Sequence, residues 1–278
     1  MRSGRRDPRS DPQPRSRIAR RGVLGRTAAL ILVLLVAQCA GNVPPPGAGI
    51  ESDFLKGKAL FDQGRYLDAI KTLETFRNEH PGSDRVDDAI FMLGEAHQRI
   101  GEDLLARDEY DRLLRDFPQS EHREEAEFLR GTAWLEEAHG PALDPEPIRS
   151  ALEAFQNYQR HYTEGKHFEE ASRYIRICQD RLAVKEWMNG KTYLSLGQPT
   201  AAALYFEKAL HILPDFSRAG DALAGLAKAR GRLGQVEPER EAWRKLLDYA
   251  TPDRMKTDRR LRSLRAEAEK ALADSTDG

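Results

Sequence analysis

The sequence lacks an apolar run long enough to cross a membrane as a helix. The apolar run at residues 27–36 holds ten uncharged and mostly aliphatic residues, whereas a membrane-spanning helix needs about 20. Aromatic residues are also few, at 8% of the chain, while charged residues make up 32%. That balance is typical of a helical protein with a wide solvated surface, in which each structural unit contacts only its neighbours.

Sequence motifs of catalysis and metal binding are also absent. The chain has no phosphate-binding glycine loop, no Gly-x-Ser-x-Gly and no His-Glu-x-x-His. The closest two of the seven histidines, His161 and His167, are six residues apart, which does not place both rings on one face of a helix. We therefore expect no catalytic residue, no bound metal and no cofactor, and we expect that the protein is not an enzyme.

Positive charge is concentrated at the amino terminus. The whole chain carries 44 basic and 45 acidic residues. Residues 1–38 hold nine arginines and two aspartates, so 35 basic and 43 acidic residues remain, and the chain from Cys39 onward has a formal charge of -8. Because nucleic-acid phosphates are bound by lysine and arginine, this acidic body argues against a nucleic-acid partner.

The amino terminus has the layout of an export signal, with an arginine-rich run, the apolar residues 27–36 and then Cys39. A cysteine just after such a run resembles the lipobox of bacterial lipoproteins. In that family the cysteine is lipidated, with palmitate among its acyl chains, and becomes the first residue of the mature protein. Gln38 departs from the usual Gly or Ala. The alternative is that Cys39 is an ordinary small residue that closes a secretory signal.

The residues after Cys39 favour the lipoprotein interpretation. They include a stretch rich in proline and glycine that cannot pack, as expected of a tether between an anchor and a domain. We assign residues 1–38 to a lipoprotein signal peptide, 39–49 to a flexible tether and 50–278 to a folded domain. Ala40 implies, by resemblance to enterobacterial sorting rules, the periplasmic face of the outer membrane. Cys178, the only other cysteine, is expected to be buried.

The domain repeats itself at a spacing of 37 residues. Residues of one kind recur at this interval, as in Gly57, Gly94 and Gly131, in Gly64 and Gly101, and in Pro81 and Pro118. We expect Gly57, Gly94 and Gly131 to lie where the two antiparallel helices of a pair cross, since only a minimal side chain lets the two backbones approach each other. Gly64 and Gly101, together with Gly197 and Gly234, should end the first helix of each pair in a left-handed conformation. The prolines should end second helices.

These recurrences define five units, near residues 50–81, 87–118, 124–163, 183–214 and 220–251. The pattern resembles the tetratricopeptide repeat, whose usual period is 34. A longer helix over 168–189 accounts for the gap before the fourth unit, and a helix over 257–273 with a charged outer face should cap the array. The predicted fold is all-α, a right-handed superhelix of about five helix pairs with a C-terminal capping helix.

Several local runs resemble a narrower family. They are Asp111–Pro118, Phe128–Gly131, Asp180–Glu186 and an insertion with three prolines at 140–147. Together with the anchor and the five repeats, they resemble the BamD family, the lipoprotein subunits of the outer-membrane barrel-assembly machine. Two departures indicate a distant member: Leu204-Tyr205 replaces a polar-basic pair, and Tyr162-Thr163 replaces the tyrosine-proline that closes the third repeat.

The resemblance implies a scaffold that binds other proteins. Its later repeats would hold the periplasmic domains of the barrel-forming subunit, and its earlier repeats would receive the terminal signal of unfolded outer-membrane proteins. Other accessory lipoproteins are further candidate partners, and the lipid anchor would hold the chain at the membrane. The main alternative is a periplasmic tetratricopeptide adaptor of another envelope system, such as cell division, peptidoglycan or pilus assembly.

A repeat array offers a groove lined by its first helices, in which a peptide can lie. The repeat register places twelve candidate binding residues along it: Phe54, Lys58, Phe61, Phe91, Glu95, Gln98, Arg99, Phe128, Arg130, Arg181, Trp187 and Lys191. For each phenylalanine taken singly, we favour a core position over a contact. Arg130 and Arg181 are equally well explained as interface arginines or as solvated or ion-paired surface charges.

Overall fold

The computed structural model describes residues 49–138 and 145–274. These residues form twelve α-helices and no strand. The predicted signal peptide at 1–38, the lipidation site Cys39 and all but the last residue of the tether at 39–49 lie outside the described residues. No helix in the described part of the chain combines the length and the apolarity needed to span a membrane.

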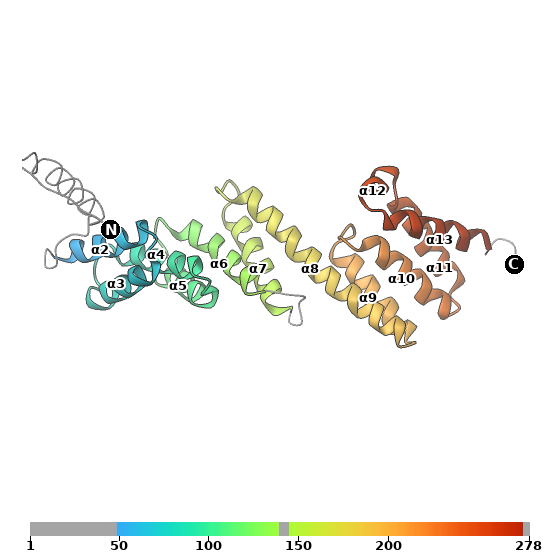
Figure 1. The fold of residues 1–278 in the computed structure, drawn as a ribbon, viewed down its shortest axis with the longest axis horizontal. Helices are drawn as coiled ribbons and strands as arrows, with labels where there is room; N and C mark the ends of the chain where they lie inside the picture. Colours follow the sequence, from blue (N-terminus) through green and yellow to red (C-terminus); the bar gives the residue numbers. More distant parts are fainter. Residues whose placement is uncertain (1–48, 139–144, 275–278) are drawn as a thin grey trace, which may run out of the picture. The chain divides into compact units, whose positions relative to one another are not determined.

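Helices α2 to α11 follow one another as hairpins, and each of them up to α10 packs against the next along the chain (Figure 1). The first three hairpins are α2 and α3 (Ile50–Asp62, Tyr66–Glu79), α4 and α5 (Val86–Arg99, Asp103–Asp116), and α6 and α7 (Arg123–Glu137, Glu146–His161). The last two are α8 and α9 (Phe168–Ser195, Pro199–Ile212) and α10 and α11 (Ala219–Arg232, Val236–Tyr249). The short α12 (Pro252–Thr257) and α13 (Arg260–Asp274) follow. This architecture confirms the predicted all-α repeat superhelix.

Glycine and proline end the helices where the sequence pattern predicts. Gly64, Gly101, Gly197 and Gly234 each follow a first helix and have φ values of 70–79°. Side chains with a Cβ atom rarely adopt this left-handed conformation, so glycine suits the position. The second helices α3, α5 and α9 each end two residues before Pro81, Pro118 and Pro214.

The helix-crossing glycines also lie at helix-pair contacts. A Cβ atom built on Gly57 would come within 2.6 Å of Leu73, one on Gly94 within 2.5 Å of Tyr110, and one on Gly131 within 2.7 Å of Phe155. In each case the large side chain comes from the second helix of the same pair. The glycine therefore forms a recess that the partner side chain fills, and the prediction for these three glycines is confirmed.

The fourth pair differs from the expected pattern because its first helix is much longer than the others. The long helix predicted over 168–189 is present as α8, which starts at Phe168 and runs without a break for 28 residues to Ser195. No proline or left-handed glycine interrupts this stretch before Gly197, so the helix continues past the predicted end at residue 189. Tyr174 in its amino-terminal part stacks on Phe155 of α7 at 4.9 Å, and Gly190 in its carboxy-terminal part lies against Phe206 of α9.

The carboxy-terminal cap starts later than the expected residue 257. Asp258 is extended, with φ -119° and ψ 102°, and separates α12 from α13. Its carboxylate accepts a hydrogen bond from the backbone N–H of Arg260 at 2.9 Å, an N-capping contact of the kind that fixes a helix start. The capping helix is therefore α13, which packs against α11.

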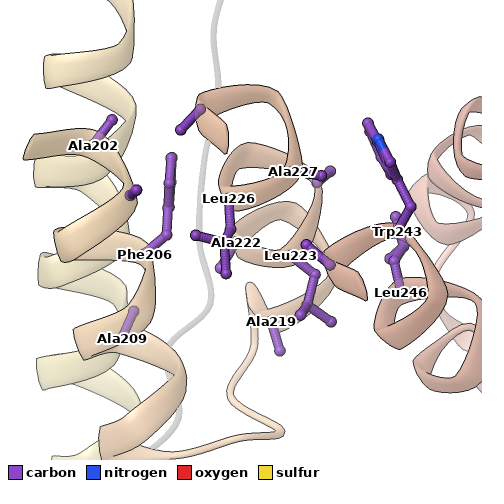
Figure 2. Close-up of a cluster of buried hydrophobic side chains, with 14 of the residues drawn as sticks. Ala202, Phe206, Ala209, Ala219, Ala222, Leu223, Leu226, Ala227, Trp243 and Leu246 are labelled. Atoms are coloured by element: carbon purple, nitrogen blue, oxygen red, sulfur yellow. The ribbon is translucent and has the colours of Figure 1, made fainter. Parts of the chain in front are cut away.

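Aromatic and aliphatic residues fill the spaces between successive helices. Figure 2 shows this packing in the last two pairs, where Phe206 of α9 points toward Ala222 and Leu226 of α10. Phe206 lies between two glycines, because Cβ atoms on Gly190 and Gly225 would each lie within 2.8 Å of its ring. Cys178 is fully buried, and burial raises the pKa of its thiol to about 11, which keeps it protonated and unreactive.

Candidate polypeptide-binding site

A pocket of about 370 Å³ lies on the first helices of the first two pairs. It is lined by α2, by α4, and by Arg85 and His122, the residues just before α4 and α6. Five of the predicted groove residues line it together: Phe54, Lys58, Phe61, Phe91 and Glu95. The other lining residues, which the sequence analysis did not single out, are Glu51, Leu55, Asp62, Arg85, Asp88, Met92 and His122.

The floor of this early-repeat pocket is aromatic and belongs partly to the core. Phe54 and Phe91 are only 5% and 8% exposed, because their rings pack on Phe76 and Tyr110 at centroid distances of 5.6 and 6.3 Å. Phe61 is half-buried and meets Tyr66 edge-on. These phenylalanines therefore both pack against neighbouring aromatic rings and line the pocket.

Charged side chains surround this floor, and most of them are paired with one another. Lys58 Nζ lies 3.0 Å from Asp62, and Arg85 lies 3.1 Å from Asp88 and 3.5 Å from Glu51. His122 Nε2 is 2.7 Å from the second oxygen of Asp88. The two permanent cations of the pocket are thus neutralised by its own carboxylates.

Glu95 is the exception among these charges. Its half-buried carboxylate has neither a hydrogen bond nor an ion pair with any residue that the structure describes. Burial raises the pKa of Glu95, and the positive charge of Arg99 on the same helix opposes this only in part. An acidic side chain that lines a pocket without a partner attracts a cation.

The structure reveals a repeated contact that the sequence analysis missed. The residue just before a first helix stacks on an aromatic ring of the preceding first helix. His122 stacks on Phe91 at 4.4 Å and His167 on Phe128 at 4.2 Å, with nearly parallel rings. The guanidinium groups of Arg85 and Arg218 take the same place over Phe54 and Trp187 at 5.7 and 5.3 Å. Three of these aromatics precede their partners by 31 residues, a spacing visible in the sequence.

The other predicted residues in and near the third pair do not join the pocket. Gln98 donates a hydrogen bond to Thr132 at 2.8 Å and accepts one from Tyr110 at 3.1 Å, so it connects neighbouring helices. Phe128 is 3% exposed and lies in the core. Arg130 forms an ion pair with Asp111 at 2.9 Å. This is the intramolecular ion pair that was the alternative to a role in an interface. Arg99 and Arg181 are exposed.

Trp187 and Lys191 lie on α8, away from the early-repeat pocket. The Lys191 ammonium and the Arg218 guanidinium each lie 5.3 Å from the Trp187 ring. Arg218 in turn lies 3.7 Å from Asp221, which also meets Arg260 of α13 at 3.1 Å. These residues form a charged surface that connects α8, α10 and α13 and carries a half-buried tryptophan.

The departure at Leu204-Tyr205 creates a third surface on the later repeats. Leu204 is 50% exposed and lines a pocket of about 610 Å³ with Arg149, Glu186, Lys208 and His211, among others. The neighbouring Tyr205 stacks on Tyr193 at 5.1 Å with nearly parallel rings. Among the described residues, no group of His, Cys, Asp or Glu has the arrangement of a metal site.

Helix pairs stacked in sequence, with a lined groove on their first helices, define a helical repeat protein of the tetratricopeptide class. Residues 51–246, which include most of all five pairs, match the model of the YfiO family, described as an outer membrane lipoprotein. The chain belongs to this family. A similar relative is the outer membrane protein assembly factor BamD of Caulobacter vibrioides, 26% identical over 215 residues that cover 76% of this chain and 70% of the relative.

Solved repeat structures are similar at a coarser level. A tetratricopeptide protein of Thermus thermophilus is 18% identical and covers 79% of this chain and 98% of its own, with a TM-score of 0.35. One from Parabacteroides merdae is 18% identical and covers 83% and 76%, with a TM-score of 0.36. Scores this low add nothing to the fold assignment, which rests on the helix pairs themselves.

Proposed function

We propose that this chain is a lipid-anchored scaffold of the machinery that assembles β-barrel proteins in the outer membrane. The observation that carries the proposal is the family match over residues 51–246, which spans the early-repeat pocket and the later-repeat surfaces alike. The similarity to a relative named as an assembly factor points to the same process. The scaffold acts by binding and not by catalysis.

In this proposal the early-repeat pocket receives segments of unfolded outer-membrane proteins. Its aromatic floor supplies apolar contact area, and the first helices of neighbouring pairs supply the walls of a groove. Peptides bind such grooves through a few anchoring side chains, and the rest of the segment adds little.

The later repeats hold the barrel-forming subunit. The polar-basic pair expected from the family is replaced by Leu204-Tyr205, so the contact at this place is more apolar here. Exposed Leu204 and the stacked Tyr205 provide such a surface beside the charged Arg149 and Lys208. An apolar centre with a charged rim is the usual composition of a specific interface.

Lipidation of Cys39 completes the proposal by holding the scaffold at the periplasmic face of the outer membrane. A lipoprotein cysteine that carries more than one acyl chain is anchored stably, since a single chain gives only marginal binding. Tethering also raises the effective concentration of the domain near a membrane-embedded partner.

A photo-crosslinking amino acid at position 58 tests the role of the early-repeat pocket. Lys58 is exposed and lines the pocket, whereas Lys71, which is also exposed, lies on α3 outside the pocket lining and serves as the matched control position. We expect crosslinks from position 58 to newly exported outer-membrane barrel proteins, and few or none from position 71. Equal crosslinking at both positions, or none at either, would contradict the proposed role.

A further inference from the structure

We propose that the early-repeat pocket selects polypeptide segments in which a lysine or arginine lies beside an aromatic or large aliphatic side chain, with Glu95 receiving the cation. This inference rests on the proposed function, because it specifies which segments the same pocket accepts. It follows from the balance of charges in the pocket and from the shape of its floor.

The charge balance of the pocket is negative. Four carboxylates line it, on Glu51, Asp62, Asp88 and Glu95, against two permanent cations, on Lys58 and Arg85. Lys58 is paired with Asp62, and Arg85 is shared between Asp88 and Glu51. Both cations are therefore already neutralised, and a bound segment meets an excess of negative charge.

Glu95 concentrates this excess at one point. The charged groups around it are Arg99 on its own helix, His122 before α6, Glu125 on α6 and Lys166 before α8. Lys166 is paired with Glu125 at 2.8 Å, and His122 is paired with Asp88 at 2.7 Å. Arg99 is exposed and makes no ion pair within the described part of the chain. The carboxylate is thus half-buried without a fixed counter-charge, and a ligand cation can supply one.

The apolar part of the pocket lies beside this carboxylate. Phe91 and Met92 are on the same helix as Glu95, one turn earlier, and Phe54, Leu55 and Phe61 line the pocket from α2. The volume of about 370 Å³ is within the ~300–1,000 Å³ range of pockets that enclose a small ligand. An aromatic or aliphatic side chain that enters this space places its basic neighbour near Glu95.

The same geometry disfavours acidic segments. A carboxylate entering the pocket would meet Glu95 and would find both permanent cations already engaged. Like charges brought together in a partly desolvated site repel strongly. The pocket therefore discriminates by charge in addition to binding apolar side chains.

Binding of three fluorescein-labelled peptides to the purified full-length protein, measured by fluorescence anisotropy, tests the inference. The peptides have the same length and alternate phenylalanine with lysine, with serine or with glutamate. We expect the affinity to fall in that order. Glu95→Gln should weaken binding of the lysine peptide about tenfold and leave binding of the serine peptide nearly unchanged. The control Glu153→Gln, at an exposed position on α7, should change neither.

Stability separates this role from a purely structural one. Burial disfavours the ionised form of Glu95 and raises its pKa. The charge therefore costs stability above the raised pKa, and this cost disappears as the pH falls below the ordinary range for glutamate, about 4.3. We expect Glu95→Gln to unfold at a higher temperature than the wild type at neutral pH, and this difference should vanish in acid. A lower unfolding temperature of the variant at neutral pH would show that the Glu95 carboxylate holds the fold together and would contradict the inference.

The outcomes distinguish the inference from the proposed function. If the three peptides bind equally well and Glu95→Gln has no effect, the charge selection is wrong and the pocket still binds polypeptides. If none of the peptides binds, the proposed role of the pocket fails, and the inference fails with it. Preferential binding of the glutamate peptide would overturn the inference directly.

Discussion

Replacing Gly94 with valine is expected to destabilise the fold by about 3 kcal/mol, at the upper end of overpacking substitutions. The new Cβ atom would lie 2.5 Å from Cε1 of Tyr110, which real contacts do not allow. The Tyr110 ring has no free space to enter, because it is fully buried and its hydroxyl donates to Gln98 at 3.1 Å. Urea unfolding followed by circular dichroism measures the loss as a lower midpoint.

The matched control is Gly82→Val in the turn after α3. No heavy atom lies within 4 Å of a Cβ built on Gly82, and we expect the free energy of unfolding to change by less than about 0.5 kcal/mol. If both variants unfolded at the same urea concentration, the close approach of α4 and α5 at Gly94 would be refuted. The helix-pair register of the whole array depends on this type of contact.

Replacing Cys39 with serine is expected to release the protein from the membrane almost completely. Serine cannot take up the lipid of a lipoprotein cysteine, and each buried methylene of an acyl chain contributes about 0.8 kcal/mol to membrane binding. The loss of two or more chains therefore changes the partition by many orders of magnitude. Fractionation of cell envelopes, with detection of the protein in the pellet and in the supernatant, measures the effect.

Cys178→Ser is the matched control for this experiment. It changes the only other cysteine, which lies inside the folded domain, and the protein should remain with the membrane. A wild-type chain found unmodified in the soluble periplasm would instead support the alternative that Cys39 closes an ordinary secretory signal. Residues 39–49 would then not connect the folded domain to a membrane anchor.

Much of the fold could be predicted from the sequence because the repeat imposes the same local requirement several times. Gly57, Gly94 and Gly131 recur at a fixed spacing, and each lies in a helix-pair contact. A single glycine would not by itself indicate a helix crossing, but three glycines at the same spacing favour this interpretation over others. The helix ends were predictable for the same reason, since a positive φ or a proline ends a helix whatever the tertiary context.

Helix boundaries set by single side chains were harder to predict. The cap begins at Arg260 because Asp258 is extended and accepts a hydrogen bond from the Arg260 backbone, a local contact without a repeated signature. The long helix α8 was predicted from residue 168, but it ends at Ser195 and not at residue 189, because the first residue that breaks it is Gly197. Neither difference moves a predicted groove residue to another helix pair.

The composition of the pocket was only partly predictable. The aromatic and charged residues at the groove register of α2 and α4 were found, since a helical period places them on one face. Arg85 and His122 were missed because they precede their helices and reach the pocket by stacking on rings of the previous pair. Such contacts depend on how two neighbouring helix pairs pack against each other. The periodicity of residues within one helix does not predict this packing.

Copurification from detergent-solubilised envelopes tests the central claim most directly. The tagged full-length chain, with its signal sequence intact, is isolated and its bound proteins are identified by mass spectrometry. We predict recovery of a barrel-forming outer-membrane subunit with periplasmic domains, and its loss when Leu204 and Tyr205 are replaced by aspartate. Recovery of cell-division, peptidoglycan or pilus-assembly proteins in place of that subunit would contradict the account.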